Sequence, residues 1–196
     1  TMLKAAAQCI QEGICFPVLL GRSHEIAAAK EALGLDFTCE EIDPREDPRR
    51  RGVYMEQLQK KRGRKGITLP DARRLLKSRV WFGSMMVEMG DADGIIGGIS
   101  RDYPEFLKPC LATIGMDENA HRVVGTYMMT IKGQLMFISD ATINIYPDAR
   151  TLAEIAVQTA RVARRFGIEP RVALLSFSNF GSSSQYRSER IEDSLE

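Results

Sequence analysis

Residues 151–183 place the strongest limit on what this 196-residue chain can fold into. Apolar side chains recur every three to four positions, which predicts an amphipathic helix that begins with a capping box at Thr151 and Glu154. Gly167 is expected to end this helix. The apolar run Val172–Leu175 then predicts a parallel strand buried on both faces, followed by a loop of small polar residues. In open α/β sheets such a strand end is where ligands bind.

The preceding sequence alternates between helical and strand-like patterns, which predicts an α/β fold with a parallel sheet. Helices are expected over 3–12, 23–33, 49–61, 71–76, 80–89 and 104–114, and strands over 17–21, 37–42 and 93–98. Apolar runs at 123–131 and 134–139 flank Lys132-Gly133, a spacing typical of a β-hairpin or a closely connected strand pair. The polar segment 115–120 is the expected boundary, giving a first α/β subdomain at 1–118 and part of a second at 119–196.

Composition argues against several classes of protein. A net charge of +1 supplies no field that would attract nucleic acid or anionic lipid. No apolar run approaches the roughly 20 residues of a membrane span, and no signal peptide is visible, so a cytoplasmic protein without membrane or nucleic-acid partners is expected. The four cysteines form no CxxC pair and the chain has only two histidines, so buried, reduced thiols are expected rather than a zinc site.

Three local motifs leave their function open. The basic run Lys60–Lys65 fits a solvated loop or, since arginine offers a planar fork, a site for a small polyphosphate. The glycines of Gly97-Gly98-Ile99-Ser100 either cradle phosphate or let a strand turn. Ser176 and Ser178 lie outside any GxSxG elbow and are interpreted as hydrogen-bond donors. Neither a GxGxxG nor a Walker A pattern is present, which excludes the usual dinucleotide and kinase phosphate loops.

Five segments together carry a family resemblance. They are AAAQCIQEGICFPVLLG at 5–21, GIT at 66–68, GDADGIIGG at 90–98, FISD at 137–140 and AEIAVQTARVARRFGIEPRVALLSFSNFGS at 153–182. With these segments the chain resembles the phosphate acetyltransferase (phosphotransacetylase) family along nearly its whole length. The variant SNFGSS at 178–183 is similar to the C-terminal phosphotransacetylase-like domain of multidomain NADP-dependent malic enzymes.

This resemblance implies two three-layer α/β/α subdomains with mainly parallel sheets, a ligand cleft between them, and a homodimer or higher homo-oligomer. The implied ligands are acetyl-CoA, CoA or acetyl phosphate, without metal catalysis. NADP and a divalent metal would belong only to a malic-enzyme part outside this chain. The ligand-binding residues implied by the matching positions are Arg62, Ser100, Arg101, Lys108, Ser176, Ser178, Asn179, Gly181 and Ser182.

Departures from the family pattern favour a regulatory ligand over acyl transfer, and no catalytic residue is assigned. Lys108 stands where transacetylases carry an arginine, which keeps the charge but loses the planar fork. The Ser/Thr-rich segment that follows the glycines in the family is here Ser100–Pro104. The family's first strand and its C-terminal catalytic segment have no counterpart, so the chain is expected to be a fragment. The alternatives are a catalytic phosphate acetyltransferase and a ligand-free oligomerisation domain.

Overall fold

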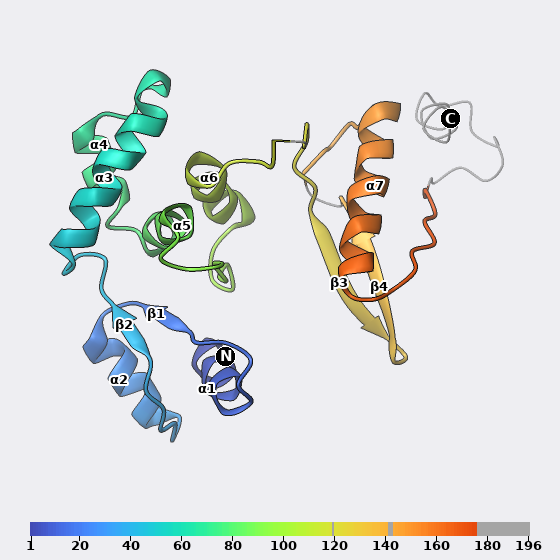
Figure 1. Cartoon of the computed structure of the whole chain (residues 1–196). Helices are drawn as coiled ribbons and strands as arrows, with labels where there is room; N and C mark the ends of the chain where they lie inside the picture. Colours follow the sequence, from blue (N-terminus) through green and yellow to red (C-terminus); the bar gives the residue numbers. More distant parts are fainter. Residues whose placement is uncertain (119, 141–142, 176–196) are drawn as a thin grey trace. The chain divides into compact units, whose positions relative to one another are not determined.

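The computed structural model describes residues 1–118, 120–140 and 143–175, and the chain divides into two compact units, Thr1–Gly115 and Met116–Glu196. The helices of the described residues are α1 (Met2–Gln11), α2 (Ser23–Ala32), α3 (Pro48–Arg62), α4 (Leu69–Leu75), α5 (Arg79–Met89), α6 (Tyr103–Thr113) and α7 (Ala149–Arg165), with a 3₁₀ turn, η1, at Gly63–Lys65 (Figure 1). The strands are β1 (Val18–Leu20), β2 (Glu40–Ile42), β3 (Thr126–Ile131) and β4 (Gln134–Ser139). Every predicted helix is confirmed, with ends displaced by at most two residues except at the start of α7, whose N-cap lies three residues before the predicted one.

In the first unit, β1 and β2 form a parallel pair in which Leu20 lies opposite Ile42, with α2 as the crossover between them. The strand predicted at 93–98 is wrong, because these residues are in no strand of the part that the structure describes. The segment instead approaches neighbouring helices closely. A Cβ built on Gly83 of α5 would lie 2.8 Å from the Ile95 side chain.

The core of the first unit lies between α3, α4 and α5. Tyr54 and Leu58 project from α3 at helical spacing and are 1% and 0% exposed. The Tyr54 ring packs on Phe82 of α5 with ring centroids 5.1 Å apart in a tilted arrangement. The buried members of the cluster are Ile42, Tyr54, Leu58, Ala72, Leu76, Phe82, Met85 and Met86. Since burial of each large side chain contributes about 1.5–3 kcal/mol, this cluster is the main source of stability in the unit.

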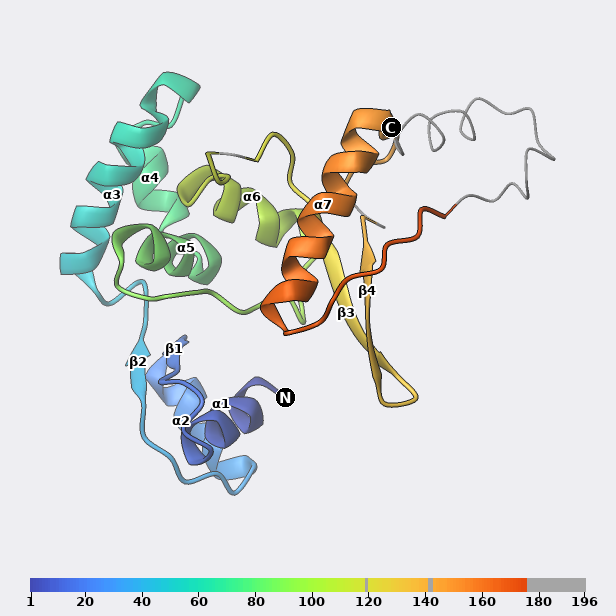
Figure 2. The same ribbon diagram turned by 45° about the vertical axis from the view of Figure 1, so that its right-hand side comes forward.

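The second unit is a hairpin covered on one face by a helix. β3 and β4 pair antiparallel through the loop Lys132-Gly133, where both residues have positive φ, +49° and +77°, as a type I′ turn requires. The predicted hairpin is therefore confirmed. α7 runs beside it in both views (Figures 1 and 2), with the Phe166 ring 5.7 Å from that of Phe137. Thr159 of α7 donates a hydrogen bond to the Ser139 hydroxyl at 2.6 Å.

The start of α7 differs from the sequence prediction, whereas its end agrees with it. Asp148, not Thr151, is the N-cap, because its extended backbone precedes the first helical residue and its carboxylate accepts from the Thr151 amide at 2.8 Å. The predicted ending at Gly167 is confirmed by its φ of +71° and by the bond from Ile168 N to Ala163 O. The strand predicted at Val172–Leu175 is wrong in the described residues, where this segment is outside any strand.

Among the described residues, none of the helices is both long enough and apolar enough to traverse a lipid bilayer.

Gly97→Ala is expected to destabilise the chain. The new Cβ would lie 3.2 Å from Cζ of Phe106 in α6, and closer still to Cε2. Such overpacking against a rigid ring lowers the free energy of unfolding by about 1–3 kcal/mol. Urea denaturation should show this as a lower midpoint. Gly52→Ala is the matched control. This glycine lies inside α3 with nothing within 4 Å of a built Cβ, so alanine should stabilise by about 0.5–1 kcal/mol. Equal midpoints for the two variants would contradict the close packing at Gly97.

Candidate functional site

The basic run Lys60–Lys65 covers the last turn of α3 and the turn η1. Cations suit this position because the C-terminus of a helix carries partial negative charge. Two members of the run, Lys61 and Arg62, also meet the C-terminus of a second helix, α6. The structure therefore divides the predicted polyphosphate cluster into residues engaged with the protein itself and residues that face solvent.

Arg62 is a capping residue for α6. Its Nε donates to the carbonyl of Ala112 at 2.5 Å, and its Nη2 donates to the carbonyl of Leu111. The last four carbonyls of a helix have no helical partner, and here two of them receive a half-buried guanidinium that carries charge. The phosphate-binding role predicted for Arg62 would therefore have to compete with these bonds.

Lys61 extends the same contact. Its ammonium lies 2.6 Å from Glu88 of α5 and 3.5 Å from the carbonyl of Ile114. The Thr113 hydroxyl donates to the carbonyl of Pro109 at 2.9 Å, and Ile114 N donates to Cys110 O. Consecutive carbonyls from Pro109 to Ala112 thus each have a partner, and the Arg62 side chain of α3 supplies two of these bonds.

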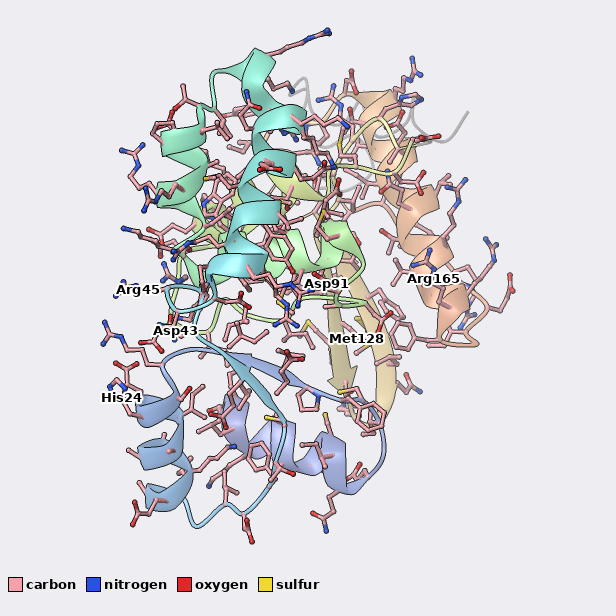
Figure 3. The ribbon with its side chains drawn as sticks, turned by 60° about the vertical axis from the view of Figure 1, so that its left-hand side comes forward. His24, Asp43, Arg45, Asp91, Met128 and Arg165 are labelled. Carbon is pink, nitrogen blue, oxygen red and sulfur yellow. The ribbon has the colours of Figure 1, made fainter. Side chains whose placement is uncertain are left out.

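The segment between α5 and α6 carries the glycines and the predicted site residues Ser100 and Arg101. Its start is fixed by the buried Tyr54 of α3, whose hydroxyl donates to the Asp91 carboxylate. Asp91, which is labelled in Figure 3, follows the C-cap residue of α5 in the chain. Ser100 and Arg101 are exposed, and Arg101 Nη1 lies 3.5 Å from Glu105 Oε2, which is a long surface ion pair. It keeps access to a solvent-borne anion.

Lys108 lies on the exposed side of α6. Arg101 just precedes the helix, Lys108 lies within it, and Arg62 contacts its end. Since an α-helix rises about 1.5 Å per residue, these cations are distributed along roughly 15 Å of one helix. The structure therefore relates three of the predicted residues to one element. Ser176, Ser178, Asn179, Gly181 and Ser182 lie outside the described residues, so their position relative to α6 stays a prediction.

The second unit contains a polar hollow that sequence reasoning did not identify. It has a volume of ≈ 430 Å³ and is lined by His121, Arg122, Asp148, Arg150, Thr151 and Glu154. Hydrogen bonds from Thr151 hold the pKa of Asp148 below its usual range, and the charge of Arg122 adds to this. The N-cap aspartate was the available sequence signal, but it is the normal start of a helix and so did not indicate a hollow.

In the part of the chain that the structure describes, no three His, Cys, Asp or Glu side chains are placed so as to hold a metal ion.

Comparison with known proteins gives a match over residues 1–196 to the family described as phosphate acetyl/butaryl transferase. The chain belongs to this family. It is 35% identical over 195 residues to a phosphate acetyltransferase of Corynebacterium glutamicum, covering 99% of this chain and 59% of that protein. It is also 35% identical over 200 residues to the NADP-dependent malic enzyme of Escherichia coli, covering 100% of this chain and 26% of that one.

Solved structures support the same family. A phosphotransacetylase from Streptococcus pyogenes superposes with a TM-score of 0.85 at 31% identity, over 98% of this chain and 59% of that one. The EutD phosphotransacetylase from Staphylococcus aureus gives 0.84 at 29% identity, over 98% and 58%. The mixed α/β fold is thus confirmed as that of the phosphate acetyl/butaryl transferase family. The chain spans about three fifths of these phosphotransacetylases and about a quarter of the malic enzyme.

Arg62→Ala is expected to lower the free energy of unfolding by about 1.5–3 kcal/mol, the range for hydrogen bonds to a charged group. Arg62→Lys should restore only part of this, because an ammonium cannot form the two-pronged contact. Arg64→Ala is the control. Arg64 is an exposed member of the same basic run and should change stability by less than about 0.5 kcal/mol. Equal urea midpoints for Arg62→Ala and Arg64→Ala would contradict the capping role.

Tyr54 should make stability depend on pH in the alkaline range. Burial, then the hydrogen bond to Asp91, raises the pKa of Tyr54 above its ordinary value of about 10. The unfolded chain therefore ionises first, so the contribution of this tyrosine is complete below about pH 10 and is lost as the pH rises further. The free energy of unfolding should fall more steeply above pH 10 for the wild type than for Tyr54→Phe, by at most about 1.4 kcal/mol per pH unit.

The control for this measurement is Tyr127→Phe, which removes an exposed phenol in β3 and should leave the wild-type slope. Parallel curves for the wild type and Tyr54→Phe would show that the Tyr54 proton is not coupled to folding.

Proposed function

We propose that this chain is the phosphotransacetylase-like domain of an NADP-dependent malic enzyme and binds acetyl-CoA or CoA as a regulatory ligand, without acyl transfer. Oxidative decarboxylation of malate to pyruvate would then occur in another part of the protein, which would hold NADP and the divalent metal. The similarity to a malic enzyme over 100% of this chain supports this proposal, as does the lysine at position 108 in place of the transacetylases' arginine.

The single observation that carries the ligand assignment is the set of cations along α6. Lys108 and Arg101 are exposed there and suit the phosphates of a CoA-type ligand. Arg62 would contribute if a phosphate replaced the carbonyls of Leu111 and Ala112 as its partner. Ser100 would donate a hydroxyl from the segment before α6. The predicted loop residues Ser176, Ser178, Asn179, Gly181 and Ser182 would close over the pantetheine end.

The proposal includes the family architecture expected above: two three-layer α/β/α subdomains with a ligand cleft between them, in a cytoplasmic homodimer or higher oligomer. Regulation further requires that acetyl-CoA bind the active and inactive states of the whole enzyme with different affinity. A ligand with equal affinity for both states does not shift the equilibrium between them.

A catalytic phosphate acetyltransferase is the second candidate, favoured by the similarity to the C. glutamicum enzyme and to solved phosphotransacetylases. Acetyl-CoA and phosphate would then yield acetyl phosphate and CoA, with cations stabilising the charge that develops during thiolate attack. The two candidates differ in one assay of the complete protein. Thioester formation from acetyl phosphate and CoA would favour catalysis. Acetyl-CoA binding that alters malate kinetics without turnover would favour regulation.

Acetyl-CoA should bind the protein in isothermal titration calorimetry, and Lys108→Ala should weaken binding by roughly tenfold or more. Loss of one hydrogen bond to a charged group costs about 1.5–3 kcal/mol, and 1.4 kcal/mol is tenfold in affinity. Lys108 is preferred to Arg62 for this test because, among the residues that the structure describes, Arg62 caps a helix and Lys108 does not. Lys4→Ala removes an exposed lysine of α1 and should bind like the wild type.

Equal affinities for the wild type and Lys108→Ala would remove Lys108 from the site. If the folded wild-type protein shows no heat of acetyl-CoA binding in calorimetry, both the regulatory and the catalytic candidates are excluded. That result would leave the ligand-free oligomerisation domain, whose deletion should abolish assembly without changing malate kinetics.

A further inference from the structure

The C-terminus of α1 turns the chain back on itself. Gly13 takes a left-handed conformation with φ +65°. The Ile14 amide donates to the carbonyl of Cys9 at 2.9 Å, and the Gly13 amide donates to the carbonyl of Ile10 at 3.1 Å. These two bonds form a Schellman motif, which returns the residues after the helix toward its last turn. Cys15 is the next residue along the chain, so the motif directs it back toward the helical turn that carries Cys9.

The two thiols interact. Partial burial raises the pKa of Cys9, and a side-chain hydrogen bond with Cys15 raises it further, with a smaller effect of the Glu12 carboxylate. Cys9 is half-buried and Cys15 is exposed, so the sequence expectation of buried thiols is wrong for Cys15. A small reagent in solution therefore reaches Cys15 directly.

The other two cysteines have different neighbours. Cys110 Sγ lies 3.4 Å from the Ser84 hydroxyl, between α5 and α6. Cys39 precedes β2, where burial raises its pKa and the charge of Lys30 opposes this effect. Cys9 and Cys15 are thus a local pair whose reactions can be separated from those of the remaining thiols.

We propose that Cys9 and Cys15 are a redox-active dithiol that closes to an intramolecular disulfide by exchange with a small-molecule disulfide. This inference is independent of the proposed acetyl-CoA function, because neither cysteine is among the residues proposed to bind acetyl-CoA.

The exchange proceeds in two balanced steps. The exposed Cys15 thiolate attacks one sulfur of the small disulfide, forms a mixed disulfide and releases one small thiolate, which takes up a proton. Cys9 then loses its proton to solvent, and its thiolate attacks Cys15 Sγ, forming the Cys9–Cys15 bond and releasing the second small thiol. The protein pair gives up two electrons and the small disulfide is reduced to two thiols. Because the pKa of Cys9 is raised, the second step should be slower at neutral than at mildly alkaline pH.

The sequence allows a direct test on the full chain. Trypsin cleaves after Lys4 and Arg22, and the peptide 5–22 contains Cys9 and Cys15 but neither other cysteine. The reduced protein is incubated with glutathione disulfide, the remaining thiols are blocked with a maleimide, and the digest is analysed by mass spectrometry. Peptide 5–22 is expected to lose two hydrogens in mass and to carry neither glutathione nor maleimide.

Two variants separate the steps. Cys9→Ser should leave a stable glutathione adduct on Cys15, since the thiol proposed to displace it is absent. Cys15→Ser should react much more slowly, because only the half-buried thiol remains. A wild-type peptide that retains glutathione on Cys15, or one linked to the peptide of Cys39 or Cys110, would overturn the proposal. So would a peptide that is fully maleimide-labelled under conditions in which Cys9→Ser gains its adduct.

Discussion

The first unit depends on one stripe of α3. Tyr54, Leu58 and Arg62 follow at four-residue spacing, so they project from the same side of the helix. The first two are buried against α4 and α5, and the third donates to the end of α6. Most of α3 is strongly polar, and this stripe carries both its buried contacts with α4 and α5 and its hydrogen bonds to the end of α6. Apolar burial and charge-assisted hydrogen bonding thus act on a single line of side chains.

The sequence was sufficient for the helices and the hairpin because their signals are local. Helical periodicity and chain-breaking glycines located all seven α-helices of the described residues, and Lys132-Gly133 specified the turn between β3 and β4. The strands at 93–98 and Val172–Leu175 were wrong for the opposite reason. An apolar run indicates that a segment can be buried. A parallel strand, however, forms only when another segment pairs with it, and the sequence pattern does not identify that partner. At 93–98 the apolar side chain of Ile95 packs on a helix glycine instead.

The candidate site was predictable in part. Residue type and family resemblance pointed to Arg62, Arg101 and Lys108, and the structure relates all three to α6. Neither source indicated that Arg62 also satisfies carbonyls at the end of that helix, since such a contact joins residues about 50 positions apart in sequence. CxxC spacing gave no sign of the proposed Cys9–Cys15 pair, because these two residues are related through the chain reversal at Gly13. The Asp148 cap was missed because Thr151 offered an equally good local pattern.

The Arg62 contact also affects how related sequences should be interpreted. An arginine that closes the end of a neighbouring helix will be retained by selection for folding, whether or not any phosphate binds there. Where a relative carries this arginine, its presence therefore does not by itself distinguish an active member of the family from one that has lost its ligand. Position 108 is exposed and caps no helix within the described part of the chain, so variation there is the more informative record of functional divergence.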